Sequence, residues 1–225
     1  MPTSTINSST DLNPPSAKGL HLYTDSSPNG FKITIALEEL GLPYHLHHVR
    51  IDDGQHKSPA FLRINPHGRI PALVDADAGI TLFESAAILL YLAQRTDRLL
   101  PVEPAARWRA ITWLMFHAAS MGPLLGQRAH FELFEAQPCP QAVERYRRLT
   151  HEAFATVDGH LAQHLWLAGD AYSIADIATF GWTHIADLVG FDFAAHRHLH
   201  AWHLRVAQRP AVVRGLALPA PAVGA

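Results

Sequence analysis

A proline stands at the head of an apolar run in the first third of the chain, and it constrains the fold more than any other residue. The run is Ile70-Pro71-Ala72-Leu73-Val74. Because proline has no N–H to give to a sheet ladder, it belongs at the start or the edge of a strand. We predict a cis Ile70–Pro71 peptide bond, which turns the N–H and C=O of Ile70 outward. Ile70 could then pair with an extended peptide as an added strand. An ordinary trans turn is the alternative, and it is the commoner state of a proline taken alone.

The segment before this proline has the pattern of a strand, a helix and a second strand. Short apolar runs bounded by turn residues occur over 19–24 and 44–51. Between them, apolar residues recur at helical spacing over 31–40, and Gly41 and Pro43 end the helix. A strand–helix–strand unit implies two parallel strands joined by a right-handed crossover.

The segment after the proline predicts a hairpin and a helix. Residues 70–74 and 80–83 are two strand candidates joined by a tight turn, so the strands should be antiparallel. A helix over 86–95 follows, with Ser85 as its N-cap. The order is therefore βαβ followed by ββα, an α/β arrangement for the N-terminal half.

Beyond this α/β segment no strand candidate of comparable strength follows, and the pattern predicts helices. Ser173 and Asp176 form a capping box, a serine with an acidic residue three places on. We therefore predict three parts: a flexible N-terminal tail over 1–18, an α/β domain over 19–97 and an all-helical domain over 104–225. The tail is rich in Ser, Thr, Asn and Pro, so it should be disordered or fold against a partner subunit.

The composition limits the classes of protein that the chain can belong to. It has 225 residues, 48% of them hydrophobic, which is enough for a sizeable core. A formal net charge of −2 gives no support for nucleic acid or an anionic membrane surface as a partner. Cys139 is the single cysteine, which excludes an intramolecular disulfide framework. The sequence shows neither a bilayer-spanning apolar run nor a secretory signal, so we expect a cytoplasmic protein.

These elements together resemble a known family. The βαβ-ββα order with Ile70-Pro71 before the third strand resembles the thioredoxin-like half of cytosolic glutathione transferases, and Ser173-Ile174-Ala175-Asp176 resembles the folding motif of their helical half. The resemblance is strongest to the bacterial nu class, disulfide-bond oxidoreductases related to the yeast prion-forming nitrogen regulator. The motifs that carry it are Ser27-Pro28-Asn29-Gly30-Phe31-Lys32, Leu37-Glu38-Glu39-Leu40-Gly41-Leu42, Phe83-Glu84-Ser85, Gly122-Pro123-Leu124-Leu125-Gly126-Gln127 and Glu144-Arg145-Tyr146.

The resemblance implies a site for glutathione, a tripeptide with two carboxylates, an ammonium and a thiol. Ser85 and the helix N-terminus behind it would supply donors for the γ-glutamyl carboxylate, and Glu84 would balance the ammonium. Ile70 would pair through its backbone with the cysteinyl unit. Arg69 or Gln55 would meet the glycyl carboxylate. For Ser85 a simple helix cap is the alternative.

The glutathione thiol is expected near Ser27 and Asn29, at a helix start that directly follows a strand. A helix N-terminus and hydrogen-bond donors stabilise a thiolate. The hydroxyl and the amide are such donors and neither is a base, so we expect catalysis by hydrogen bonding to the thiolate. The nu class often has Thr where Ser27 stands, and a plain turn with an N-cap is the alternative. Tyr23 is a rival because some classes use a tyrosine near this point, but its place at a strand end predicts a position in the core or at the rim.

Residues 26–29 occupy the place where thioredoxin-like oxidoreductases carry cysteine, and they contain none. Thiol–disulfide exchange would therefore run between bound glutathiones. The resemblance implies two glutathiones, or glutathione disulfide, and disulfide-reductase activity. Gln127 and Arg145 match the residues that would face the second molecule, and the fork of the Arg145 guanidinium suits a carboxylate. For Arg145 a surface salt bridge with Glu144 or its neighbours is the alternative.

Other activities and partners stay open at this stage. Conjugation of glutathione to electrophiles and reduction of organic hydroperoxides are the runner-up reactions. A non-catalytic regulator or scaffold is the rival from another class, since fold does not decide function. The family implies a homodimer. His196, His200 and His203 share a helix face without a Cys or carboxylate pattern to complete a metal site, so we expect no metal and a solvated face.

Overall fold

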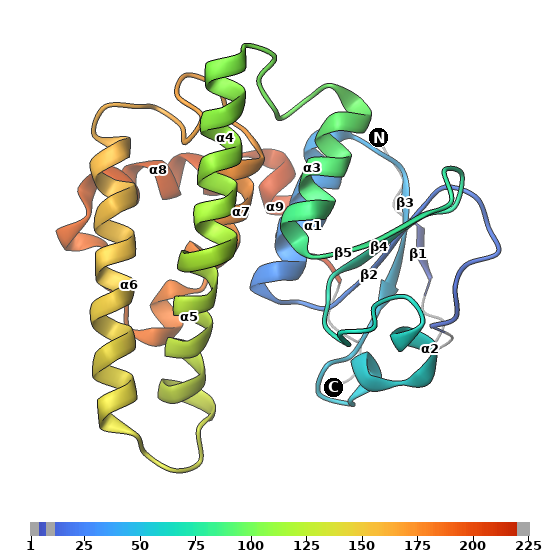
Figure 1. Cartoon of the computed structure of the whole chain (residues 1–225), viewed down its shortest axis with the longest axis horizontal. Coiled ribbons are helices and arrows are strands. Elements are labelled where there is room, and N and C mark those ends of the chain that lie inside the picture. Colours follow the sequence, from blue (N-terminus) through green and yellow to red (C-terminus); the bar gives the residue numbers. More distant parts are fainter. Residues whose placement is uncertain (1–4, 8–11, 220–225) are drawn as a thin grey trace. The chain divides into compact units, whose positions relative to one another are not determined.

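The computed structural model describes residues 5–7 and 12–219, and these fall into two compact units (Figure 1). The first unit runs to Thr96 and is completed by the segment from Pro210 onward, and the second is Asp97–Arg209. The first contains a mixed sheet and the second is built of helices. This confirms the predicted fold class, a thioredoxin-like α/β domain and a helical domain.

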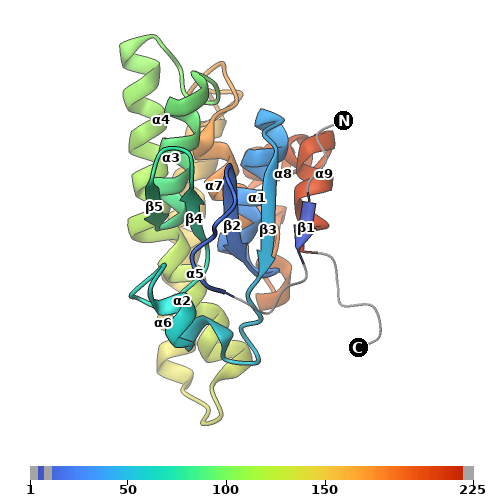
Figure 2. The same ribbon diagram turned by 90° about the vertical axis from the view of Figure 1, so that its right-hand side faces the viewer.

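The sheet of the first unit has the strand order β1-β3-β2-β4-β5, which Figure 2 shows face-on. β2 and β3 are parallel, whereas β4 is antiparallel to both β2 and β5. The parallel β2–β3 pair and the antiparallel β4–β5 pair are those that the βαβ and ββα patterns predict. The strands are β1 (Thr5–Asn7), β2 (Leu20–Thr24), β3 (Tyr44–His48), β4 (Ala72–Asp75) and β5 (Ile80–Phe83).

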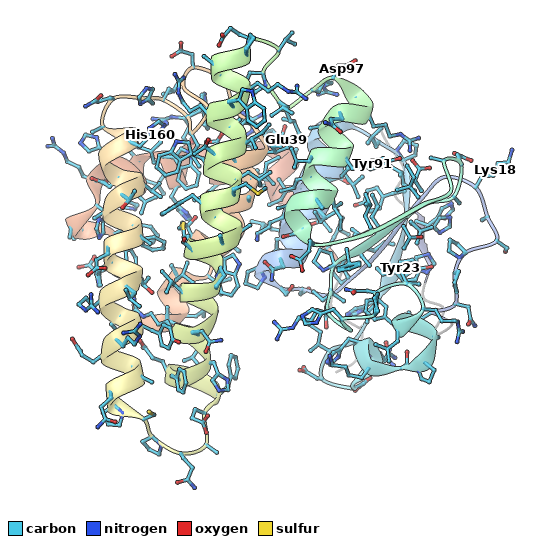
Figure 3. All side chains as sticks on the ribbon, in the orientation of Figure 1. Lys18, Tyr23, Glu39, Tyr91, Asp97 and His160 are labelled. Atoms are coloured by element: carbon cyan, nitrogen blue, oxygen red, sulfur yellow. The ribbon has the colours of Figure 1, made fainter. Side chains whose placement is uncertain are left out.

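Helices cover both faces of this sheet (Figures 1 and 2). On one face α1 (Pro28–Leu40) packs against α3 (Ser85–Thr96). On the other lies the short α2 (Pro59–Leu62), whose Phe61 belongs to an apolar cluster with Tyr23. Tyr23, which Figure 3 labels, is fully buried. The α1 and α3 layer positions the candidate site.

The described part of the N-terminal tail differs from the prediction that residues 1–18 are flexible. Thr5–Asn7 forms β1, which pairs in parallel with β3. Leu12 is 3% exposed, and the Tyr23 hydroxyl donates a hydrogen bond to the carbonyl of Asn13. The polar residues of β1 are thus held by pairing with the edge of β3, which the composition of the tail does not predict. Residues 1–4 and 8–11 of the predicted tail lie outside the described residues.

The last helix also departs from the predicted boundary of 104–225. The α9 helix (Pro210–Leu216) packs on α1 in the first unit instead of joining the helical unit. A Cβ on Gly215 would lie 2.7 Å from the backbone of Ile35, so only glycine allows this approach. The Thr34 hydroxyl donates to the carbonyl of Gly215 over 2.8 Å. Proline at the first position of a helix is favourable, so Pro210 begins a helix that the pattern analysis did not predict.

The second unit is organised around the buried Asp176. Its carboxylate accepts hydrogen bonds from the backbone N–H groups of Leu167 and Ser173, and from the indole of Trp202. This confirms the predicted capping box and ties the start of one helix to a loop and to another helix. The α-helices are α4 (Pro104–Phe116), α5 (Gly122–Ala129), α6 (Pro140–Leu161), α7 (Ile174–Thr183) and α8 (Arg197–Ala207), with π-helical turns at His117–Met121 and His130–Phe134.

Within residues 5–7 and 12–219, none of the helices combines the length and apolar character that crossing a bilayer requires.

Candidate active site

The Ile70–Pro71 peptide bond is cis, as the sequence predicts. Ile70 is half-buried and packs against the apolar cluster that contains Tyr23 and Phe61. The ladder between β4 and β2 begins at Ala72, so Ile70 stands just outside it at the head of the strand. This is the position from which a main chain can pair with an added extended peptide.

The connection from β2 to α1 is held by Ser27 and Gly30. Ser27 is the N-cap of α1, and its Oγ accepts a hydrogen bond of 3.1 Å from the N–H of Gly30. A Cβ on Gly30 would lie 2.2 Å from the carbonyl oxygen of Asp25, so the helix can start this close to the strand end only with glycine there. Ser27 and Asn29 thereby lie at the N-terminus of α1 directly after a strand, as predicted, and both are half-buried.

Lys32 joins two of the predicted site residues, although it is not itself among the residues that the sequence predicts for the site. Its ammonium donates to Asn29 Oδ1 over 2.8 Å and to Ser85 Oγ over 3.3 Å. The side chain is 3% exposed. Burial lowers the pKa of Lys32 to about 7, and the nearby negative charge of Glu84 opposes this shift. Asn29 on α1 and Ser85 on α3 are thus brought together through one buried lysine.

The start of α3 differs from prediction by one residue. Ser85 is the first residue of the helix, and the preceding Glu84 has a φ of 70°. The N–H of Ile88 donates to the carbonyl of Glu84 over 3.0 Å, so Glu84 occupies the position before the helix that was expected for Ser85. Glu84 is exposed and Ser85 half-buried. A carboxylate therefore stands beside a helix N-terminus, which suits a ligand carrying an ammonium and a carboxylate.

Gln55 and Arg69 belong to the same unit but make other contacts. Gln55 Oε1 accepts a hydrogen bond of 3.0 Å from the N–H of Arg50. Arg69 is exposed, and its carbonyl accepts from the side-chain amide of Asn65. Their predicted role toward a glycyl carboxylate stays a prediction.

Gln127 and Arg145 lie in the second unit, on α5 and α6, and both side chains are exposed. The α5 and α6 helices pack against each other. The predicted role of Gln127 and Arg145 toward a second glutathione stays a prediction, and so does the alternative of a surface salt bridge between Arg145 and Glu144 or its neighbours. The neighbouring Arg147 pairs with Glu132.

The remaining candidates are structural. Tyr23 is fully buried and stacks on His47, with ring centroids 4.3 Å apart, so it lies in the core as predicted. His196 is 6% exposed, so the expected solvated histidine face is wrong at that position. Among residues 5–7 and 12–219 there is no group of three or more His, Cys, Asp or Glu residues that could hold a metal ion.

Comparison with known proteins identifies the two units. Residues 26–95 match the glutathione S-transferase N-terminal domain, and residues 117–210 match the glutathione S-transferase C-terminal domain. Among similar proteins, the disulfide-bond oxidoreductase YfcG of Escherichia coli strain K12 is 41% identical over 202 residues, which cover 88% of this chain and 94% of that protein.

Solved structures of similar proteins contain bound glutathione. A glutathione transferase from Burkholderia graminis, with two glutathione molecules per subunit, has a TM-score of 0.86 and 38% identity over 90% of this chain and 89% of that one. A glutathione transferase from Pseudomonas putida, with one glutathione disulfide per subunit, has a TM-score of 0.86 and 35% identity over 92% of this chain and 94% of that one. The chain belongs to the glutathione S-transferase family.

Proposed function

We propose that this protein is a glutathione-dependent disulfide-bond reductase. It uses two bound glutathiones, and it also binds the glutathione disulfide that they form. The observation that supports the proposal is the start of α1, a helix N-terminus directly after a strand that carries Ser27 and Asn29 and no cysteine. Ser27 and Asn29 occupy it, whereas the single cysteine, Cys139, lies at the start of α6 in the other unit. The relatives that contain two glutathiones or glutathione disulfide support the same reaction.

The reaction balances with two glutathiones and one disulfide. The thiolate of the first glutathione attacks one sulfur of the substrate disulfide, which forms a mixed disulfide and expels one thiolate. The second glutathione thiolate then attacks the glutathione sulfur of the mixed disulfide. Glutathione disulfide forms, the second substrate thiolate leaves, and the two protons lost by the glutathione thiols protonate the two products.

Each site residue has a role in this proposal. The hydroxyl of Ser27 and the amide of Asn29 donate hydrogen bonds to the attacking thiolate and lower its pKa. Ser85 and the N-terminus of α3 bind the γ-glutamyl carboxylate, Glu84 binds the ammonium, and the main chain of Ile70 pairs with the cysteinyl unit. Gln55 or Arg69 meets the glycyl carboxylate, and Gln127 and Arg145 serve the second glutathione.

Calorimetric titration tests the proposal. Two reduced glutathiones, or one glutathione disulfide, should bind per subunit, and the protein should reduce hydroxyethyl disulfide with glutathione. Asn29→Ala should lower kcat/KM at least about tenfold, because a hydrogen bond to a charged group contributes roughly 1.5–3 kcal/mol. Cys139→Ser should retain full activity.

The other outcomes discriminate the rival functions. One reduced glutathione with little affinity for the disulfide form favours a conjugating transferase or a peroxidase toward organic hydroperoxides. If the protein binds neither reduced glutathione nor glutathione disulfide, the enzyme proposals are wrong and a regulator or scaffold is left. We also expect a homodimer and a cytoplasmic location. Light scattering of the purified protein tests the dimer, because it measures the mass of the particle in solution.

A further inference from the structure

Lys32 lies on α1 between two groups that the proposed function assigns to different parts of glutathione, the cysteinyl thiol and the γ-glutamyl carboxylate. Asn29 is assigned to the thiol and Ser85 to the γ-glutamyl carboxylate. The Lys32 ammonium reaches both, at 2.8 Å from Asn29 Oδ1 and 3.3 Å from Ser85 Oγ. One side chain therefore contacts both parts of the candidate site within a single compact unit.

The contacts with the Lys32 ammonium determine how the Asn29 amide and the Ser85 hydroxyl are oriented. In its charged form Lys32 only donates hydrogen bonds, so both contacted atoms must then act as acceptors toward it. With Oδ1 held by Lys32, the amide of Asn29 directs its Nδ2 donor away from the lysine. With Oγ of Ser85 accepting from Lys32, the hydroxyl hydrogen must point to another acceptor. Both residues are thus oriented as donors, which an anionic ligand requires.

The position of this lysine is unfavourable for the fold alone. Lys32 is 3% exposed, and the residues that follow it on α1 include the fully buried Ile33 and Ile35. Well-packed apolar side chains usually stabilise such a position better than a buried charge does. Glu84, which is exposed, is the charged group whose field acts on Lys32. A buried and strongly perturbed lysine between two polar site residues is typical of a functional position.

We propose that Lys32 is a positioning residue that orients the Asn29 amide toward the glutathione thiolate and the Ser85 hydroxyl toward the γ-glutamyl carboxylate. This inference rests on the proposed function, because it assigns Lys32 to the same site. It adds that the two ends of the site are coupled: loss of Lys32 impairs thiol activation and glutathione binding together.

Lys32→Met tests this, because methionine keeps most of the side-chain volume and removes the ammonium. The pKa of the bound glutathione thiol is measured from ultraviolet thiolate absorbance as pH is varied, beside kcat and KM for glutathione in disulfide reduction. We expect a raised thiol pKa, a higher KM for glutathione and a loss of kcat/KM of roughly tenfold to a hundredfold, the range for losing a charge-assisted hydrogen bond. Lys18→Met is the matched control, because Lys18 is exposed and precedes β2.

A double-mutant cycle separates positioning from a merely structural role. If Lys32 acts through Asn29, adding Lys32→Met to Asn29→Ala should raise the thiol pKa no further. The same cycle with Ser85→Ala should be non-additive in KM. A lower melting temperature with unchanged thiol pKa and KM, or additive effects in both cycles, would overturn the inference.

A second substitution and the behaviour of the wild-type protein complete the test of Lys32. If Lys32→Met does not fold, Lys32→Gln replaces it, since its amide keeps a shorter neutral donor; an intermediate thiol pKa is expected and a wild-type value overturns the inference. If wild-type protein binds glutathione and reduces disulfides while the Lys32 variants match it, only the inference about Lys32 fails. If wild-type protein binds no glutathione, the proposed function fails with it.

Discussion

The hydroxyl oxygen of Ser27 accepts a 3.1 Å hydrogen bond from the N–H of Gly30. The oxygen caps the helix, and the hydroxyl hydrogen can still donate to a thiolate. Ser27→Ala removes both functions and should lower the free energy of unfolding by about 1 kcal/mol, while disulfide reduction falls more than the stability change explains. Ser27→Thr keeps the hydroxyl and should retain most activity. Urea unfolding and the hydroxyethyl disulfide assay measure the two effects, and full activity in Ser27→Ala would exclude Ser27 from the thiol site.

Gly30→Ala should distort the loop that carries the thiol site. The added Cβ would stand 2.2 Å from the carbonyl oxygen of Asp25 and 2.5 Å from Oγ1 of Thr24, so the start of α1 must move. We expect lower stability and a loss of glutathione affinity measured by calorimetry. Gly159→Ala is the matched control, because a Cβ there meets nothing within 4 Å and alanine favours a helix by up to about 1 kcal/mol. Equal behaviour of the two variants would contradict the steric argument.

Asp176→Ala should strongly destabilise the helical unit. The substitution leaves the N–H groups of Leu167 and Ser173 and the indole of Trp202 buried without their acceptor. Leaving a buried donor without its acceptor costs about 1–3 kcal/mol for each group. Asp170→Ala removes an exposed carboxylate from the same region and should change stability little. Chemical denaturation followed by tryptophan fluorescence compares the variants, and a change below about 1 kcal/mol for Asp176→Ala would contradict the prediction.

The stability of the protein should carry a pH dependence from Lys32. Burial lowers its pKa to about 7 from the ordinary 10.5, so between these values the unfolded chain binds more protons than the folded one. The free energy of unfolding therefore rises with pH from about 7 to 10.5 through this group. Lys32→Met lacks this contribution. The difference in stability between wild type and variant should shift in favour of wild type as pH increases, and a constant difference would show that Lys32 titrates normally.

The parts of the site that depend on local chemistry could be predicted from the sequence. The cis bond before Pro71, the cap at Ser27 and the capping box at Ser173 each depend on residues close together in the chain. Their side chains satisfy backbone groups of their own turn, whatever the rest of the fold does. The glycine that makes the connection from β2 to α1 possible was likewise visible as part of a motif.

Lys32 and α9 could not be predicted in this way, because their positions depend on packing between distant segments. A lysine on an amphipathic helix ordinarily faces solvent. Its burial follows from α3, whose Ser85 lies 53 positions further along the chain. Eight of the thirteen residues of α1 are buried, Lys32 and Thr34 among them, and the polar residues along this segment give no signal that its lysine is one of the buried ones.

The packing of Gly215 against Ile35 makes the thioredoxin-like unit discontinuous in the chain. During synthesis, β2, α1, β3, β4, β5 and α3 all emerge before the segment 97–209, and α9 emerges only after it. The ribosome must therefore synthesise the whole helical unit before α9 can pack on α1 in the first unit. Until then the face of α1 around Ile35 lacks its native cover, so this unit reaches its final form after translation of a segment that it does not contain.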